Sequence, residues 1–179
     1  MNILVLYGSL EGQTEKIAEH IAEVIRNRGY QATTLSGENL PADFSTADYR
    51  AAIIGGSIHM NKYPKCVKTF VNSHRDWLNK VPSAFFTVCM AIHSQEEKSK
   101  TQAAEYGEHF LAQAGWQPRL TAIFAGAVKY TRYNFFTRFI MKMISKHEGG
   151  STDTSRDHEY TDWGKVARFA ETFIDEINN

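Results

Sequence analysis

Short apolar runs alternate with longer segments of helical periodicity along almost the whole chain. Apolar runs of strand length lie at residues 2–6, 31–35, 51–55, 84–88 and 120–125. Segments with apolar residues three and four positions apart lie at residues 13–28, 64–78, 98–114 and 162–177. Strands that alternate with helices favour a parallel sheet with right-handed crossovers. The pattern therefore predicts a doubly wound α/β fold with a five-stranded parallel sheet.

The last helical segment has a clear apolar face and a predicted start. Its apolar positions are Val166, Phe169, Ala170, Phe173 and Ile177. Asp162 falls in the first turn, where the helix dipole favours an acid, and Thr161 is expected to be the cap.

The turn between the first strand and the first helix is the strongest candidate for a binding site. It reads YGSLEGQT over residues 7–14 and follows the apolar run ILVL. Free backbone N–H groups and the helix dipole meet at such a point and suit a phosphate group. Hydroxyl groups can donate further hydrogen bonds, and glycine allows close approach. The candidate phosphate ligands are Ser9, Leu10, Glu11, Gly12, Gln13 and Thr14.

The spacing of this turn separates it from two common nucleotide loops. It lacks the Gly-Lys-Ser/Thr ending of a triphosphate P-loop and the three-glycine fingerprint of dinucleotide-binding folds. It resembles the phosphate loop of flavodoxins, Ser/Thr-x-Thr-Gly-x-Thr, which implies that it holds the monophosphate of FMN. Glu11 replaces the middle threonine, and because a carboxylate repels a phosphate, we expect its side chain to point to solvent. An ordinary strand-to-helix turn capped by Ser or Thr is the alternative.

A phosphate loop after the first strand favours the flavodoxin-like strand order 2-1-3-4-5. Ligands of such sheets bind beyond the carboxyl ends of the strands, where the strand order reverses. The loops after the third and fourth strands are therefore expected to hold the flavin ring, mainly through backbone groups. Their candidate residues are Ser57, Ile58, His59, Cys89, Met90 and Ala91.

Composition narrows the classes of function. The chain of 179 residues is 42% hydrophobic, enough for the core of one domain over residues 1–179. A formal net charge of +0 argues against nucleic-acid binding and mildly against an acidic electron shuttle. The two cysteines, Cys66 and Cys89, form no CxxC pair, so neither a disulfide framework nor a metal site is predicted. We expect no signal peptide and no membrane-spanning helix.

A long segment separates the fifth strand from the last helix, and residues 129–152 form a predicted insertion. Its first part, residues 129–147, reads KYTRYNFFTRFIMKMISKH and contains no acid. Apolar residues recur at helical spacing with cations on another face, as in helices that lie in a lipid headgroup layer. The candidates for contact with substrate or membrane are Lys129, Arg132, Phe135, Phe136, Arg138, Phe139 and Lys142. A helix packed on its own domain and, more weakly, a nucleic-acid surface are the alternatives.

Several runs together resemble one family of flavoproteins. They are AGAVKYTRY at 125–133, FIMK at 139–142, GGSTDT at 149–154 and YTDW at 160–163, joined by GQT at 12–14 and PSAF at 82–85. They are similar to the menaquinone-dependent protoporphyrinogen IX dehydrogenases of bacterial haem synthesis, over essentially the whole chain. The resemblance implies an FMN enzyme that oxidises protoporphyrinogen IX to protoporphyrin IX in three two-electron steps. It also implies menaquinone or ubiquinone as electron acceptor and peripheral association with the cytoplasmic side of the inner membrane. The oligomeric state, including a homo-oligomer, stays open.

Two histidines are catalytic candidates within this interpretation. His59 follows the third strand and His93 follows the fourth, at positions where the resembled family carries arginine. Imidazole titrates near neutral pH, so either side chain could accept a proton or bind a substrate carboxylate. Lys129, Arg132 and Arg138 are alternative partners for the carboxylates. The run at 149–154 is expected either to support the flavin edge or to cap the insertion.

Three other functions remain open at this point. A flavodoxin-type electron carrier would have no substrate, and the neutral charge and basic insertion count against it. An NAD(P)H:quinone reductase is the second alternative, although no nucleotide fingerprint supports it. A binding module without flavin is the third.

Overall fold

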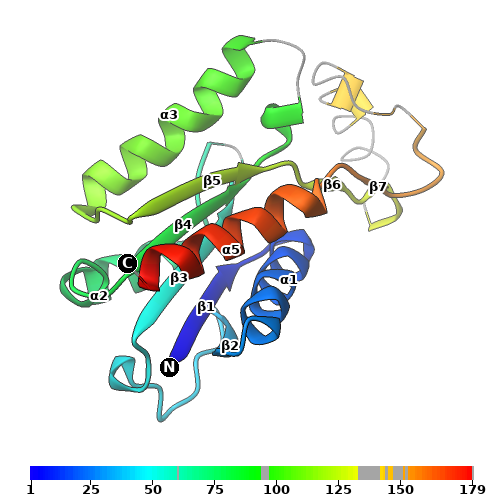
Figure 1. The fold of residues 1–179 in the computed structure, drawn as a ribbon. Coiled ribbons are helices and arrows are strands. Elements are labelled where there is room, and N and C mark those ends of the chain that lie inside the picture. The colour runs from blue at the N-terminus through cyan, green and yellow to red at the C-terminus, as the bar shows by residue number, and fades with distance from the viewer. Residues whose placement is uncertain are drawn as a thin grey trace.

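The structure is a computed structural model that describes residues 1–59, 61–93, 97–132, 142–143, 145–146, 151 and 153–178. Its centre is a five-stranded parallel sheet with the order β2-β1-β3-β4-β5, which confirms the predicted order (Figure 1). The strands are β1 (Asn2–Gly8), β2 (Gln31–Ser36), β3 (Ala51–Ser57), β4 (Ser83–Val88) and β5 (Leu120–Phe124). β2 lies at an edge and is only half-buried, whereas β3 and β4 are buried along their whole length.

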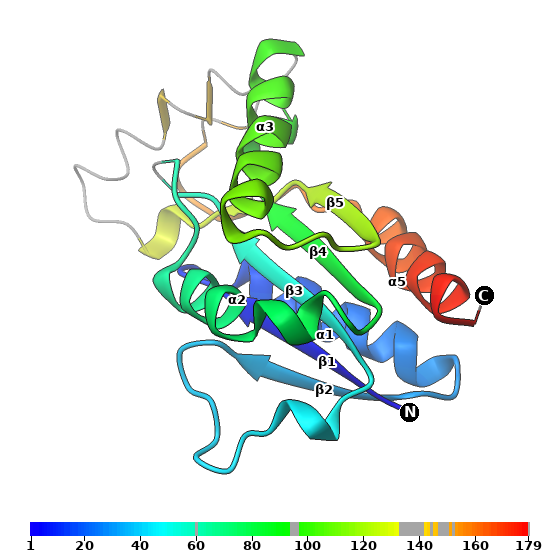
Figure 2. The same cartoon turned by 90° about the vertical axis from the view of Figure 1, so that its left-hand side faces the viewer.

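In the described part of the chain, four α-helices cover the two faces of the sheet. α1 (Gln13–Asn27) and α5 (Trp163–Asn178) pack on one face, and α2 (Lys65–Leu78) and α3 (Glu97–Ala114) lie on the other (Figure 2). The helical spacing of the sequence explains which side each helix buries. In α1, for example, the residues buried against the sheet include Ile17, Ala18, Ile21, Ala22 and Ile25.

The pleat of β1 divides its apolar run between two hydrophobic clusters. Ile3 and Val5 belong to the cluster that contains α1 and α5. Leu4 and Leu6 belong to the cluster that contains α2 and Trp116. Because successive strand side chains point to opposite faces, a run without polar residues requires helices on both sides. The buried run ILVL thus accounts for the three-layer architecture.

Close packing inside the sheet explains one glycine of β3. A Cβ atom added at Gly55 would lie 1.9 Å from Cζ of Phe86 on the neighbouring strand β4. The Phe86 ring is fully buried and also packs against Phe124 and Phe169. The ring cannot move away, so this position requires a residue without a side chain.

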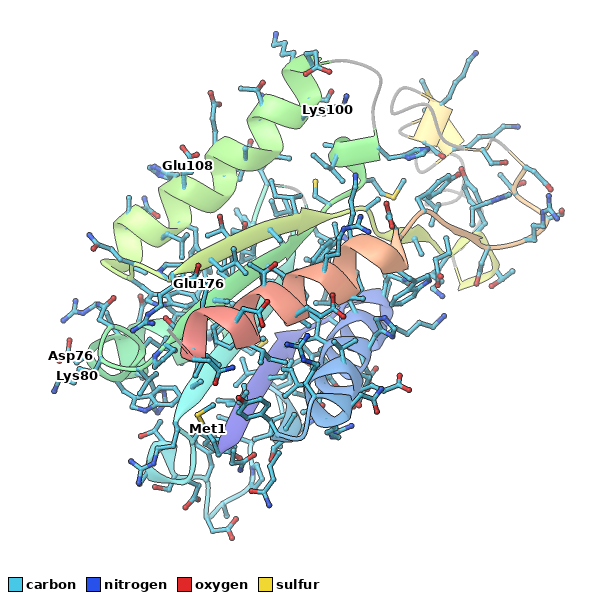
Figure 3. All side chains as sticks on the ribbon, in the orientation of Figure 1. Met1, Asp76, Lys80, Lys100, Glu108 and Glu176 are labelled. Carbon is cyan, nitrogen blue, oxygen red and sulfur yellow. The ribbon has the colours of Figure 1, made fainter. Side chains whose placement is uncertain are left out.

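A small antiparallel sheet joins the two ends of the insertion. β6 (Ala127–Val128) pairs with β7 (His158–Glu159), and both strands lie near the N-terminal end of α5 (Figure 1). Figure 3 places Met1, Asp76 and Lys80 at the opposite end of the molecule. The insertion therefore leaves and re-enters the fold at the carboxyl ends of the main strands. Strands of two residues carry no periodicity, so sequence reasoning missed this sheet.

The helix expected over residues 129–147 lies mostly outside the described residues. Tyr130–Arg132 form a 3-10 turn, so an α-helix does not begin at Lys129. The described positions Lys142, Met143, Ser145 and Lys146 are helical.

The expected cap of the last helix is wrong by one residue. Asp162 caps α5, because its Oδ1 accepts a hydrogen bond from the backbone N–H of Lys165 at 3.0 Å. The hydroxyl of Thr161 instead donates to the carbonyl of Ala125 at 2.8 Å. Thr161 is used to tie two loops together, which the local sequence does not reveal.

Candidate functional site

The loop between β1 and α1 leaves the start of the helix without a side-chain cap. Gly12 takes the N-cap position with φ 87°, a left-handed conformation that suits glycine. The backbone N–H of Gly12 donates to Oγ of Ser9 at 2.8 Å, which closes the turn. The N-cap residue, Gly12, contributes no side-chain hydrogen bond to the first-turn N–H groups of α1. These groups are available to an anion, which argues against the alternative of an ordinary capped turn.

A hollow opens in front of this loop, at the carboxyl ends of four strands. The loop after β1, the ends of β3 and β4 and the segment after β5 meet there, as expected for this topology. Its lining residues are Ser9, Glu11, Gln13, Thr14, Ser57, Ile58, His59, Val88, Cys89, Met90, Gly126 and Ala127. We call this space the flavin hollow, because it joins the candidate phosphate loop to the two candidate ring loops.

Two buried polar atoms of the flavin hollow have no hydrogen-bond partner within the described structure. They are Oγ of Ser57 and Oε1 of Gln13, in side chains that are 6% and 4% exposed. Buried polar groups are nearly always paired, because an unpaired one costs free energy. Thr14, 1% exposed, adds a hydroxyl in the first turn of α1. These donors and acceptors fit a mononucleotide whose phosphate lies at the helix start and whose polar groups reach the two orphaned atoms.

The segments on either side of the insertion hold the phosphate loop in place. Nε2 of Gln13 donates to Oγ1 of Thr161 at 2.9 Å, and Thr161 in turn donates to the carbonyl of Ala125. Lys16 forms an ion pair with Glu159 of β7 at 3.2 Å. The phosphate loop is thus fixed by residues that follow the insertion.

Glu159 shows how this contact is stabilised electrostatically. Burial alone would raise the pKa of the Glu159 carboxyl. Hydrogen bonds from Gln13 and Lys16 outweigh that effect and hold the pKa below its usual value. The carboxylate is therefore charged at neutral pH and keeps Lys16 at the start of α1.

Most predicted cofactor residues lie on the flavin hollow, but three do not line it. Leu10 is 62% exposed, and Gly12 faces a neighbouring groove along α1. Ala91 follows Met90 but is not among the residues that line the flavin hollow. We expected the side chain of Glu11 to point to solvent. In the structure Glu11 is half-buried at the rim of the flavin hollow and takes part in an interaction.

Sequence reasoning missed three lining residues, Val88, Gly126 and Ala127. Their positions in the sequence could have indicated them, because they end or follow strands whose carboxyl ends meet at this edge of the sheet.

The two candidate histidines lie in different places. His59 lines the flavin hollow, and its N–H and C=O pair with Lys62 at 3.0 Å each, which closes a tight loop. His93 faces a second hollow, where its ring lies 4.5 Å from the ring of Tyr160. The structure therefore places the two histidines at different hollows.

Of the candidates for contact with substrate or membrane, only part can be placed. Lys129 is half-buried beside α1, the backbone of Arg132 lies in the 3-10 turn, and Lys142 is exposed. Phe135, Phe136, Arg138 and Phe139 lie outside the described residues. None of the helices described here is long and apolar enough to cross a membrane.

Ser151 explains part of the run at 149–154. Its carbonyl accepts hydrogen bonds from the hydroxyls of Tyr130 and Ser145, at 3.0 and 2.9 Å. Its N–H donates to the hydroxyl of Tyr160 at 2.6 Å. Ser151 therefore anchors the base of the insertion.

Comparisons with known proteins agree with this geometry. The sequence matches the Flavodoxin domain family over residues 4–155. It is 36% identical over 170 residues to the protoporphyrinogen IX dehydrogenase (quinone) of Escherichia coli strain K12, across 95% of this chain and 93% of that protein. It is 34% identical over 170 residues to the protein of the same name from Leishmania major, across 95% of this chain and 73% of that protein.

Solved structures support the fold. Oxidised flavodoxin 1 from Bacillus cereus matches with a TM-score of 0.60 at 17% identity, over 98% of both chains. A flavodoxin from the domain Archaea matches with a TM-score of 0.57 at 16% identity, over 100% of both chains. From the family match and the identity to these dehydrogenases, the chain belongs to the flavodoxin-domain proteins and, among them, to the family of the quinone-dependent protoporphyrinogen IX dehydrogenases.

Proposed function

We propose that this protein binds FMN in the flavin hollow, oxidises protoporphyrinogen IX to protoporphyrin IX and passes the electrons to a membrane quinone. One observation carries the cofactor assignment: the orphaned atoms of Ser57 and Gln13 lie beside an uncapped helix start. The substrate and acceptor follow from the 36% identity to a protein named for both.

The residues of the flavin hollow have different roles in this proposal. When bound, FMN supplies the two-electron redox chemistry that the protein's own side chains lack. The N–H groups of the phosphate loop and the hydroxyl of Thr14 bind the phosphate. Ser57 and Gln13 orient the cofactor, and the half-buried side chains of Ile58 and Met90 limit the access of water.

His59 is the proton acceptor in this proposal. Oxidation of a porphyrinogen releases protons as well as electrons, and imidazole accepts a proton near neutral pH. The loop that carries His59 is held by its two backbone bonds to Lys62, so the side chain stays at the hollow.

Thr14→Ala tests the phosphate assignment. Loss of a charge-assisted hydrogen bond should weaken FMN binding about 10- to 100-fold, or about 1–3 kcal/mol. Quenching of FMN fluorescence measures the affinity. Thr101→Ala is the control, because Thr101 also lies near a helix start but donates to the carbonyl of Glu97. Wild-type affinity in Thr14→Ala would place the phosphate elsewhere.

Contact with a membrane surface is part of the proposal, because a quinone acceptor resides in the bilayer. The basic and aromatic composition of residues 129–147 supports it. Replacing Phe135, Phe136 and Phe139 together with serine should release the protein from anionic liposomes in a flotation assay. FMN affinity serves as the control for an intact fold. Unchanged flotation would show that these side chains do not contact lipid.

An anaerobic assay tests the whole function. FMN-loaded protein is mixed with protoporphyrinogen IX and menadione, and the fluorescence of the porphyrin product is followed. We expect product to form only when protein and quinone are both present. An electron carrier would give no product. Rapid bleaching of the flavin by NADPH, without porphyrinogen oxidation, would favour a NAD(P)H:quinone reductase.

A further inference from the structure

A second hollow shares the segment after β5 with the flavin hollow. It has a volume of about 230 Å³, and its wall includes His93, Ala125, Tyr160, Asp162 and Lys165. The two spaces are neighbours along the chain, because Ala125 lines the second hollow and Gly126 lines the flavin hollow. No step of the proposed function uses it.

The wall of this hollow carries two formal charges of opposite sign, on Lys165 and Asp162, and both residues are exposed. Lys165 lies in the first turn of α5, and no partner of its ammonium group is found among the described residues. The start of α5 adds the positive end of the helix dipole. His93 adds an imidazole to the wall of the hollow. A lysine, an imidazole and a helix start around one cavity suit a carboxylate.

The acid in the wall is already engaged. Oδ1 of Asp162 accepts the backbone N–H of Lys165 at 3.0 Å, as a helix cap. Its negative charge still repels an anion bound in the hollow, because like charges repel. Asp162 therefore weakens anion binding at this hollow but does not prevent it. Removing its charge should strengthen binding, and a substitution of Asp162 can test this.

Tyr160 gives the hollow a defined shape. Its ring packs on His93 at 4.5 Å, its hydroxyl accepts the N–H of Ser151 at 2.6 Å, and its own N–H donates to the carbonyl of Gly126 at 3.0 Å. These contacts come from the loop after β4, the base of the insertion and the edge of the flavin hollow. The imidazole of His93 is thereby held in position.

We propose that this hollow is a carboxylate subsite that holds one propionate side chain of the porphyrinogen while the macrocycle lies at the flavin hollow. The inference rests on the proposed function for the identity of the substrate. A porphyrinogen carries two propionates on one edge of an otherwise apolar ring. Consecutive residues line this hollow and the flavin hollow, so an anion site here would determine which edge of the porphyrinogen ring enters the flavin hollow.

Three substitutions on α5 test the subsite by steady-state kinetics. Lys165→Gln should raise the KM for protoporphyrinogen IX about 10-fold, with kcat nearly unchanged, because a charge-assisted contact to the substrate is lost. Asp162→Asn should lower the KM, because asparagine still caps the helix but carries no charge. Arg168→Gln is the matched control, since it removes an exposed cation of the same helix outside the hollow.

The dimethyl ester of the substrate isolates the role of the carboxylate. We expect Lys165→Gln and wild type to have the same KM for the ester. An equal rise in KM for acid and ester, or no rise for the acid, would overturn the subsite. So would an effect of Arg168→Gln as large as that of Lys165→Gln.

A binding measurement separates this inference from the proposed function. Flavin-free protein is titrated with protoporphyrin IX and with its dimethyl ester, followed by porphyrin fluorescence. Weaker binding of the acid by Lys165→Gln, with unchanged binding of the ester, supports the subsite even if turnover fails. Lack of turnover by wild type with either substrate would contradict the proposed function alone. Turnover with identical acid binding by wild type and Lys165→Gln would contradict the subsite alone.

Discussion

At the scale of single residues, two buried serines on neighbouring strands behave differently. Ser57 ends β3 and its Oγ has no partner, although the side chain is only 6% exposed. Ser83 begins β4, where its hydroxyl donates to the carbonyl of Leu78 at 2.8 Å and accepts from Nε1 of Trp116 at 3.0 Å. The first serine costs stability in the protein without cofactor, and the second contributes to it.

We predict opposite effects of the same substitution at these two positions. Ser57→Ala should raise the free energy of unfolding of the flavin-free protein by about 1 kcal/mol and weaken FMN binding. Ser83→Ala should lower the free energy of unfolding by about 1–3 kcal/mol, because a buried indole N–H loses its acceptor. Urea denaturation measures both. A loss of stability in Ser57→Ala would show that its hydroxyl is paired within the protein.

At the scale of elements, glycines in β3 and α3 occupy different environments. An added Cβ at Gly55 would collide with the buried ring of Phe86, so the strand accepts no side chain there. An added Cβ at Gly107 would lie 3.5 Å from the hydroxyl oxygen of Tyr63 and 3.7 Å from Oγ1 of Thr87, which are ordinary contacts. Gly107 is buried within α3, where glycine is a poor helix former.

The two glycine-to-alanine variants should therefore shift stability in opposite directions. Gly55→Ala should lower the free energy of unfolding by about 1–3 kcal/mol through overpacking. Gly107→Ala should raise it by about 0.5–1 kcal/mol through helix propensity and a less flexible unfolded chain. Thermal denaturation followed by circular dichroism compares them. Equal midpoints for Gly55→Ala and wild type would mean that Phe86 can move.

At the scale of the whole molecule, stability should depend on pH through two tyrosines with a raised pKa, the buried Tyr63 and the half-buried Tyr7. Burial raises the pKa of Tyr63 from 10.0 to about 12, although its hydrogen bond with Thr87 at 2.8 Å acts in the opposite direction. Burial and the nearby Glu15 raise the pKa of Tyr7 to about 12 as well. Between pH 10 and about 12 the unfolded chain has lost these protons and the folded chain retains them. The free energy of unfolding therefore falls as pH rises through this range.

Tyr63→Phe isolates one contribution to this alkaline loss. The variant lacks the titrating hydroxyl, so its free energy of unfolding should fall less steeply above pH 10 than that of the wild type. Near pH 12 its loss should be smaller than the wild-type loss by about 2–3 kcal/mol. Urea denaturation at neutral pH gives the baseline cost of losing the bond to Thr87. An alkaline slope identical to that of the wild type would show that Tyr63 does not titrate with a raised pKa.

The sequence by itself determined the architecture and the place of the loop that we propose to bind phosphate. Helical spacing and short apolar runs are local properties, and the fully apolar run of β1 requires helices on both faces. The order of the strands followed because a phosphate loop after the first strand restricts the topology. These features depend on residues a few positions apart, which a single sequence displays.

Only the tertiary structure decided which side chains share a cavity. Gln13 meets Thr161 across 148 positions, and that contact turns Thr161 from the expected helix cap into a tie between loops. His93 and His59 follow neighbouring strands, yet one faces each hollow. Such outcomes depend on how loops from distant parts of the chain pack together, because burial and hydrogen-bond competition are set by neighbours in space. Local periodicity carries no record of them.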